Sequence, residues 1–384
     1  MPFEYWSQVY VFGQTPTRLA GALYFITALF SFDKMFSMNK HSKIVILPVA
    51  LWIWLITVEL FNGLSFGFDV GFYFQFIYLI VFYFLIINEF RINDRTKWGM
   101  MIALVLSMLV VTVLLKLGIG IGLNRENDTV SSLDEVRRVW FFGLNPNALG
   151  NYAVLAILFS FFLYFEYFKG LLSKKLILAA IPILFLPLFY SGSSGAFLTL
   201  FFGLSIYFSI RKGNVFKKLK FIFLLFLVLF LVFNSLSRFE YLNNKLYLFL
   251  EAGNTTGRTE IWASALSVIS NNWFFGLGKN GAEFALEKLS GNHYTAHNVY
   301  LDVFMWGGIF AILIYLMLFV SVALNSLKYY RETGFSSSLV IVFIMAFLML
   351  KSGAGFTLKL FWFFMPIAGF YVSNLTQNLI SKKQ

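Results

Sequence analysis

The chain has 384 residues, of which 59% are hydrophobic and only 12% are charged, and its mean hydropathy is +0.76. A soluble domain carries about 25% charged residues, so the composition excludes an ordinary soluble protein and favours a helical protein embedded in a membrane. The formal net charge of +12 does not indicate nucleic acid as a partner, because the basic residues lie between apolar runs and form no basic domain or arm.

Eleven apolar stretches approach the length of about 20 residues that a helix needs to cross a bilayer. They cover residues 17–34, 44–61, 70–88, 99–122, 149–168, 175–190, 195–210, 219–236, 299–324, 338–352 and 357–374. We therefore expect an all-α integral membrane protein with about eleven transmembrane helices, forming a single polytopic domain over residues 1–384. The first residues lack a basic region followed by an apolar core, so no cleaved signal peptide is expected.

The basic residues favour one set of alternate segments between these stretches. Of the 30 Lys and Arg residues, 18 lie in the short segments of that set, whereas most of the others lie in two long loops. Because short cytoplasmic loops collect Lys and Arg, we predict the C-terminus inside and the long loops, at about 123–148 and 237–298, outside. The spans hold few charges, and the polar residues gather in the outer loops. A pore-forming transporter would instead place polar residues in mid-span, so we expect a site at the outer membrane surface.

A short amphipathic helix is predicted within the large outer loop. Its apolar residues recur at helical spacing, and they are Ile261, Trp262, Ala265, Leu266 and Ile269. This spacing places Arg258 in the first turn, where helix N–H groups and a guanidinium together suit a pyrophosphate. The alternative is that Arg258 pairs with a carboxylate or with a lipid headgroup.

Two histidines, His293 and His297, follow the predicted helix. Their spacing of four suggests zinc, but the metalloprotease pattern needs Glu directly after the first His, and Tyr294 stands there. The chain has no Cys, so a thiolate metal site is excluded. A histidine titrates near neutrality and can act as a general base. On the residues alone, His297 is either structural or catalytic.

The motifs of this loop, taken together, resemble the signature of the O-antigen polymerase and O-antigen ligase superfamily of bacterial membrane glycosyltransferases. They are G-R-T-E-I-W at 257–262, W-F-F-G-L-G at 273–278, and H-N-V-Y-L-D with a following G-G at 297–308. Two looser matches, N-P-N-A-L-G at 145–150 and S-G-S-S-G-A-F at 191–197, precede them. The resemblance implies a fold like that of GT-C-type glycosyltransferases, which use lipid-linked donors.

The resemblance also implies roles for particular residues. Such enzymes transfer a glycan from undecaprenyl pyrophosphate to an acceptor hydroxyl without a metal, so the resemblance implies no metal and no cofactor. Arg258 matches the family's arginine and would stabilise the pyrophosphate leaving group. His297 matches its histidine and would act as the general base. Asn298 would position the histidine or the sugar, and Tyr300 in the same motif is a candidate substrate-binding residue.

The chain departs from the family pattern in the turn before the seventh span. Ser194 stands where the family often has arginine, so a second cation must come from elsewhere. Arg137 and Arg138 are candidates because they are positively charged and lie in the first outer loop, although both could instead pair with nearby acidic residues. Glu260 either orients Arg258 or is a solvated carboxylate. We include all four residues in the predicted substrate site.

The resemblance therefore predicts a polymerase of O-antigen or capsule repeat units in the bacterial inner membrane, with its active site on the periplasmic face. Its partners would be an undecaprenyl-pyrophosphate-linked oligosaccharide, the lipid bilayer and a chain-length regulator protein. An O-antigen ligase acting on lipid A-core is the alternative, since both reactions need the same Arg and His chemistry. A transporter or flippase for lipid-linked sugars is a third reading, but it should not depend on a histidine base.

Overall fold

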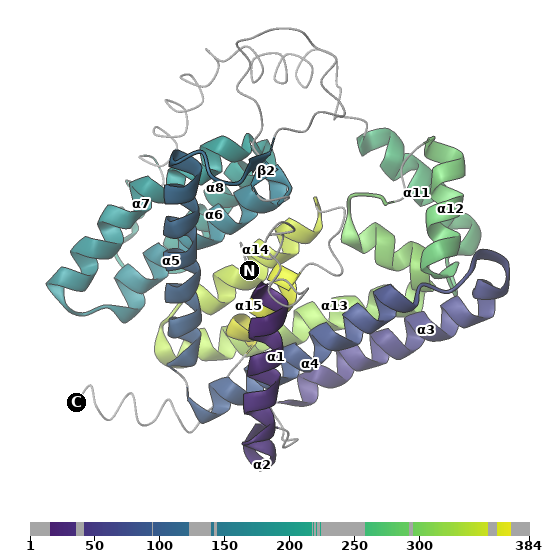
Figure 1. Cartoon of the computed structure of the whole chain (residues 1–384), viewed down its shortest axis with the longest axis horizontal. Coiled ribbons are helices and arrows are strands. Elements are labelled where there is room, and N and C mark those ends of the chain that lie inside the picture. Colours follow the sequence, from purple (N-terminus) through teal and green to yellow (C-terminus); the bar gives the residue numbers. More distant parts are fainter. Residues whose placement is uncertain are drawn as a thin grey trace, which may run out of the picture. The chain divides into compact units, whose positions relative to one another are not determined.

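The structure is a computed structural model that describes residues 16–35, 42–93, 95–122, 140–141, 144–216, 218, 220, 223, 258–291, 295–351 and 359–369. Its helices are α1 (Pro16–Leu29), α2 (Phe32–Met35), η1 (Ser42–Val45), α3 (Ile46–Phe66), α4 (Val70–Ile92), α5 (Thr96–Lys116), α6 (Pro146–Phe162), the π-helix η2 (Leu163–Tyr167), α7 (Leu171–Ser191), α8 (Ser194–Ile210), α11 (Arg258–Asn272), α12 (Gly278–Ser290), α13 (Val299–Thr333), α14 (Ser337–Met349) and α15 (Lys359–Gly369) (Figure 1). Two strands of two residues, β1 (Ile121–Gly122) and β2 (Trp140–Phe141), pair antiparallel.

Each predicted apolar stretch contains a described helix except 219–236, which lies largely outside the described residues, whereas α11 and α12 lie outside the apolar stretches. Within the part of the chain that the structure describes, five helices are long and apolar enough to cross a membrane, at Val70–Phe90, Thr96–Lys116, Pro146–Tyr167, Leu171–Ser191 and Val299–Thr333. A helix suits this environment because it satisfies its own backbone hydrogen bonds where water is absent. The helical membrane class is thus supported, while the count of eleven spans and the outer position of the large loop stay predictions.

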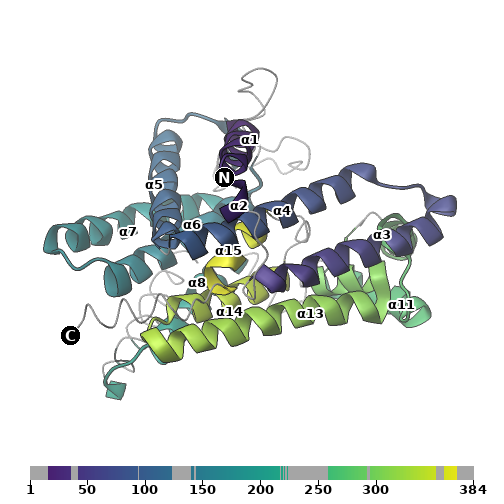
Figure 2. The same cartoon turned by 90° about the horizontal axis from the view of Figure 1, so that it is seen from below.

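The chain divides into two compact units. Unit 1 comprises Met1–Met35, Asn93–Leu246 and Phe335–Ser337, and unit 2 comprises Phe36–Ile92, Tyr247–Gly334 and Ser338–Gln384. In unit 1, α6 packs against α5, α7 and α8 (Figure 2), and its side chains from Leu149 to Phe159 are almost all fully buried. This helix is therefore the core of the unit.

The two looser motifs pack against each other in unit 1. Asn145 caps α6 by accepting a hydrogen bond from the N–H two residues on, at 2.8 Å, and Pro146 takes the first helical position. A Cβ at Gly150 would lie only 2.8 Å from Ser191 Oγ and from Ala196 Cβ. Glycine at 150 thus allows α6 to approach the turn between α7 and α8. These motif residues have a structural role.

Glu166, one of the few charged residues within a predicted span, also has a structural role in unit 1. Its Oε1 accepts hydrogen bonds from the N–H and the hydroxyl of Ser336, both at 3.0 Å, and from the N–H of Ser337 at 3.2 Å. Ser337 is the first residue of α14. The carboxylate therefore satisfies N–H groups that the start of a helix leaves without intrahelical partners.

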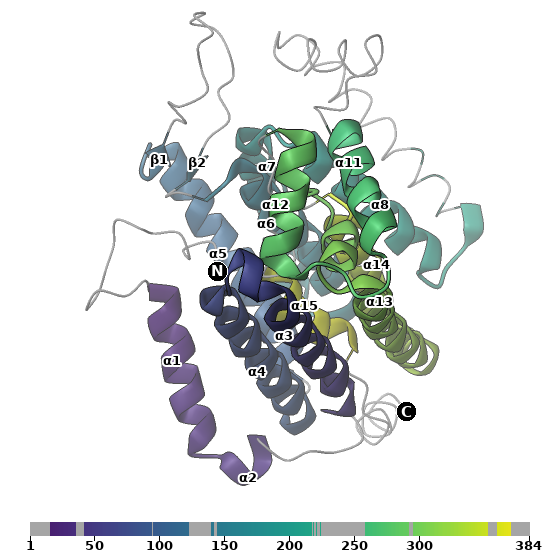
Figure 3. The same ribbon diagram turned by 90° about the vertical axis from the view of Figure 1, so that its right-hand side faces the viewer.

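Unit 2 is built around α13. This helix packs against α3 and α15, and α4 packs against the same two helices. The pair α11 and α12 lies side by side and packs on α13 and α3 (Figure 3). The chain returns from α12 directly to the start of α13, so the segment with the family motifs rests on the two helices α3 and α13.

Candidate active site

The predicted amphipathic helix is present as α11, and it begins at Arg258. Its buried stripe consists of Ile261, Ala265, Val268 and Ile269. Leu266 was expected on this stripe, which was wrong, because its side chain is 56% exposed. Arg258 itself is half-buried at the first helical position.

Ala296, the residue before His297, is held from both sides. Its N–H donates to Asp302 Oδ1 at 2.8 Å, and its carbonyl oxygen accepts from Trp262 Nε1 at 2.9 Å. Ala296 is fully buried, and of the two hydrogen bonds the one to Asp302 is buried while the one from Trp262 is partly buried. Trp262 lies one helical turn after Arg258, and residues four apart share a helix face. The bond from Trp262 therefore brings the face of α11 that carries Arg258 to the peptide next to His297.

His297 has a left-handed backbone, with φ at +52°, and among the described residues it is the one non-glycine residue with a positive φ. Such a conformation costs about 1–3 kcal/mol and persists only where the surroundings impose it. Here the two bonds to Ala296 impose it on one side. On the other side Asn298 caps α13, accepting from the N–H groups of Tyr300 at 3.1 Å and Leu301 at 3.4 Å. Asn298 thus contributes to holding His297, while its contact with a sugar stays a prediction.

The W-F-F-G-L-G segment docks onto a kink in α13. At Gly307 and Gly308 the backbone leaves the helical conformation, which exposes groups that a helix would satisfy. Leu277 N–H donates to Met305 O and Ile309 N–H donates to Trp273 O, both at 2.9 Å.

Glycine is required at this contact. Gly276 has φ at +76°, and a Cβ there would lie 2.6 Å from the nitrogen of Gly308. A Cβ at Gly308, with φ at +61°, would collide with the carbonyl of Phe274. The indole of Trp54 on α3 closes the contact by donating to Gly307 O at 2.7 Å. The two motifs therefore seat α11 and α12 on α13, and their glycines serve packing.

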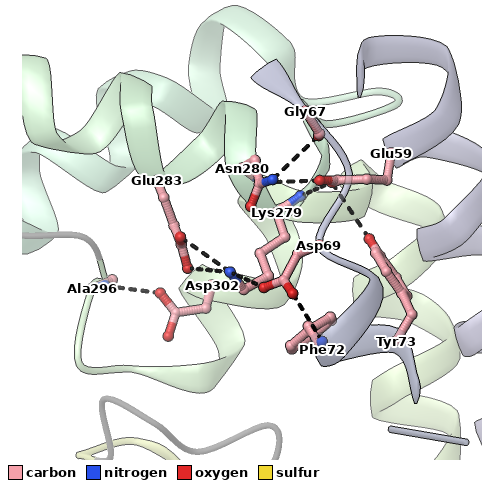
Figure 4. Close-up of polar contacts among 10 residues, drawn as sticks. All are labelled: Glu59, Gly67, Asp69, Phe72, Tyr73, Lys279, Asn280, Glu283, Ala296 and Asp302. Atoms are coloured by element: carbon pink, nitrogen blue, oxygen red, sulfur yellow. Dashed lines mark hydrogen bonds and ion pairs between the residues drawn. The ribbon is translucent and has the colours of Figure 1, made fainter. Parts of the chain in front are cut away.

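Glu59 on α3 caps the start of α12 from outside that helix. Its carboxylate accepts from the N–H groups of Lys279 and Asn280, the latter at 3.3 Å, and from the hydroxyl of Tyr73 at 3.4 Å (Figure 4). Leu277, the N-cap residue, makes no side-chain cap of its own. Glu59 is 1% exposed, so it supplies both a capping acceptor and a negative charge at the positive end of α12.

Lys279 joins α12 to the turn between α3 and α4. Its ammonium lies 3.0 Å from Asp69 Oδ2 and 3.1 Å from Glu283 Oε1 (Figure 4). Burial acts to lower the pKa of Lys279, but Glu283 and Asp69 together raise it above its usual value. Burial acts to raise the pKa of Asp69, and hydrogen bonds from Phe72 and Lys279 bring it below its usual value. Sequence analysis did not identify this cluster, because its partners lie about 210 residues apart.

Tyr300 connects the start of α13 to α14. Its hydroxyl donates to Ala346 O at 3.2 Å, and its ring packs against Tyr315. These contacts give Tyr300 a structural role, and its predicted contact with substrate stays a prediction. They also place the last turn of α14 beside the segment that holds His297.

The remaining predicted site residues are either exposed or lie outside the described residues. Glu260 is exposed in the first turn of α11. Ser194 is exposed at the first position of α8, in unit 1. Arg137, Arg138 and His293 lie outside the described residues. Their roles in the substrate site stay predictions. Among the residues that the structure describes, no group of three or more His, Asp or Glu side chains is arranged to hold a metal ion.

A comparison with known protein families covers the segment that carries Arg258 and His297. Residues 178–316 match the family model described as O-Antigen ligase. This confirms the resemblance to the O-antigen polymerase and ligase superfamily, and the matched segment includes Arg258, His297 and the kink at Gly307 and Gly308. The O-antigen ligase match supports glycan transfer of the polymerase or ligase type by a multi-pass membrane protein. No curated protein matches the chain.

Proposed function

We propose that the chain is a bacterial polysaccharide polymerase. It transfers a growing glycan from undecaprenyl pyrophosphate to a hydroxyl of a lipid-linked repeat unit at the outer face of the inner membrane. The observation that carries the proposal is the hydrogen bond from Trp262 to Ala296. It supports a single site in which a cation on α11 and a strained histidine before α13 act together.

In the proposed reaction, His297 accepts the proton of the attacking hydroxyl while that oxygen bonds to the anomeric carbon of the donor. General-base help of this kind contributes about 10²- to 10⁴-fold in rate. The bond from the anomeric carbon to the phosphate oxygen breaks, and the pyrophosphate leaves with the electron pair. The proton on His297 then passes to solvent, which balances charge and restores the base.

Arg258 is proposed to stabilise the leaving group. Negative charge grows on the pyrophosphate as the glycosidic bond breaks, and a guanidinium can make two parallel charge-assisted hydrogen bonds to phosphate oxygens. Removing one such preorganised donor from a site typically costs about 10²- to 10³-fold in rate. The first turn of α11 also offers backbone N–H groups to an anion at the same place.

The ligase reaction is the second candidate, and the description of the matching family favours it. A ligase would use the same donor, the same base and the same cation, but it would pass the glycan to lipid A-core. We place the polymerase first because the chain is compact and rich in Phe, Ile, Leu and Asn, as in polymerases of the superfamily.

The test uses the full chain in nanodiscs with an undecaprenyl-pyrophosphate-linked repeat unit as the sole substrate. A ladder of products that disappears in His297→Ala and in Arg258→Ala supports the polymerase. A single transfer that appears only after lipid A-core is added supports the ligase. Product formation by neither route, from protein confirmed as folded, contradicts glycan transfer and supports a transporter.

A further inference from the structure

The segment between α11 and α12 presents three consecutive aromatic side chains to its surroundings. Trp273, Phe274 and Phe275 are 53%, 43% and 57% exposed. The rings contact one another, with centroids 5.2 Å apart for Trp273 and Phe274 and 4.7 Å apart for Phe274 and Phe275. A contiguous exposed apolar patch of this kind marks a surface that a protein, a ligand or a membrane covers. We call these three residues the aromatic tip.

The aromatic tip packs against two apolar helices of the same unit, α3 and α13. The ring of Phe310 on α13 lies 5.1 Å from that of Phe274 and 6.3 Å from that of Phe275, and the ring of Trp54 on α3 lies 6.1 Å from that of Phe275. Helix α13 is long and apolar enough to cross a membrane, and α3 is apolar over Ile46–Asn62. Trp54 lies near the middle of that range, so the tip meets α3 well inside its apolar part.

The turn between α3 and α4 shows how far the tip lies from the end of these helices. The apolar span of α4 begins at Val70, and Asp69, directly before it, holds the ion pair with Lys279. Charged groups are costly in the hydrocarbon, so this turn belongs at the membrane surface. Helix α3 ends at Phe66, twelve residues after Trp54, which corresponds to about 18 Å along its axis. Since the hydrocarbon core is about 30 Å thick, Trp54 and the tip beside it fall within it.

The backbone of the tip has the partners that this depth requires. Non-helical backbone is tolerated in the hydrocarbon region only where protein groups satisfy it. Leu277 N–H donates to Met305 O, and Trp273 O accepts from Ile309 N–H, both at 2.9 Å. The kink in α13 frees the groups that make these bonds. The kink and the tip therefore satisfy each other without water.

The polar side chains before the tip are also satisfied within the protein. The amides of Asn271 and Asn272 both donate to carbonyl oxygens of α11, at 3.1 Å. No charged residue occurs between Glu260 and Lys279. The tip can therefore enter an apolar environment without carrying a charge or an unpaired amide with it.

The aromatic tip is continuous with an exposed apolar face of α13. Starting at Phe310, exposed apolar side chains recur every three or four residues, so they share one side of the helix. They are Phe310, Leu313, Met317, Val320 and Leu324. On a helix that crosses a membrane, such a face is covered by acyl chains. The tip contacts its first member, so the same chains reach the tip.

We propose that the aromatic tip is embedded in the bilayer, where its rings contact phospholipid acyl chains and hold α11 and α12 against the membrane. The inference goes beyond the proposed function, because it requires no glycan transfer. It also changes the prediction for the large loop, since part of the segment at 237–298 enters the membrane. We assign the tip to acyl chains, and not to a polyprenyl chain or a second copy, because its surface continues the lipid-facing side of α13.

The absence of Cys from the chain allows a single introduced cysteine to carry a nitroxide spin label. Phe274→Cys and Phe275→Cys place the label at two positions of the tip, so that one folded variant is sufficient. Leu313→Cys on the exposed face of α13 is the control for lipid, and Lys288→Cys on the exposed side of α12 is the control for water. The full chain is studied in phosphatidylcholine nanodiscs, and thermal unfolding identifies the folded variants.

Electron paramagnetic resonance then measures how often each label collides with O2, which concentrates in hydrocarbon, and with a water-soluble nickel chelate. We expect the labels at the tip to favour O2 over the chelate as strongly as the label at Leu313→Cys does. The label at Lys288→Cys should show the opposite preference. Addition of undecaprenyl phosphate should leave the O2 collisions at the tip unchanged.

Three results would overturn the inference. The first is access of the chelate to the tip as high as at Lys288→Cys, which would place the tip in water. The second is shielding of the tip from both O2 and the chelate, which would mean that protein covers it. The third is a loss of O2 collisions at the tip, but not at Leu313→Cys, when undecaprenyl phosphate is added. That result would assign the surface to the polyprenyl chain.

Discussion

Trp262 donates its indole N–H to the carbonyl oxygen of Ala296 at 2.9 Å, and this bond joins the helix that begins with Arg258 to the peptide that precedes His297. The Trp262→Phe variant keeps the ring and removes the donor. It should lower the free energy of unfolding by about 1–3 kcal/mol, because a buried carbonyl loses its partner.

The same variant should lower kcat and kcat/KM together, since His297 would lose its position in the transition state. Trp273→Phe is the matched control, because the Trp273 side chain is 53% exposed. Steady-state kinetics and thermal unfolding of both variants check the prediction. Equal stability and activity in the two variants would show that the bond does not position His297.

Because His297 has a left-handed backbone, replacing it with glycine should lower activity without lowering stability. His297→Gly removes the side chain and relieves a conformation that costs a non-glycine residue about 1–3 kcal/mol, so thermal unfolding should not occur at a lower temperature. Activity should fall by about 10²- to 10⁴-fold. Asn298→Ala should behave in the opposite way. It removes the helix cap and should cost about 1 kcal/mol of stability, with a smaller effect on the rate.

Gly308 provides a test of the contact between the two glycine motifs. Gly308→Ala places a Cβ against the carbonyl of Phe274 at a positive φ, and should destabilise the protein by more than about 1 kcal/mol. Gly99→Ala is the control, because Gly99 lies within α5 with open space around it. There alanine should be neutral or stabilising by about 0.5–1 kcal/mol. The unfolding temperatures of the two variants are compared. A wild-type unfolding temperature for Gly308→Ala would show that the close contact between Gly308 and Phe274 is not needed for stability.

The carboxylate of Glu59 should stabilise the start of α12. Glu59→Ala leaves the N–H groups of Lys279 and Asn280 without their acceptor, and should cost about 1–3 kcal/mol. Limited proteolysis should then cut within α12 more readily than in the wild type. Glu287→Ala removes a carboxylate from α12 that makes no such cap, and should leave the cleavage rate unchanged. Equal cleavage of both variants would mean that Glu59 does not hold this helix.

Much of the fold and part of the site follow from the sequence alone. Apolar runs predict the helices because burial in lipid needs both length and continuous hydrophobicity. Helical spacing also predicts α11 and the place of Arg258 in its first turn. By contrast, α12 was not predicted. Its buried face consists mostly of small residues, Gly278, Gly281 and Ala282 with Leu286, so no run of large apolar residues marks it in the sequence.

The contacts that assemble the site could not be predicted from sequence. Glu59 caps a helix about 220 residues away, and Trp262 donates to Ala296 across 34 residues. No local pattern encodes either pair. A signal does exist for the cap at Asn298, because Asn just before an apolar helical run is typical of an N-cap. The resemblance to the superfamily directed attention to a substrate role instead.

The most direct test of the central claim is glycan transfer by His297→Gly in nanodiscs, with and without added imidazole. The account predicts that the folded variant makes no product ladder, and that imidazole entering the space left by the side chain partly restores it. A ladder from His297→Gly without imidazole, at a rate near that of the wild type, would contradict the assignment of His297 as the general base.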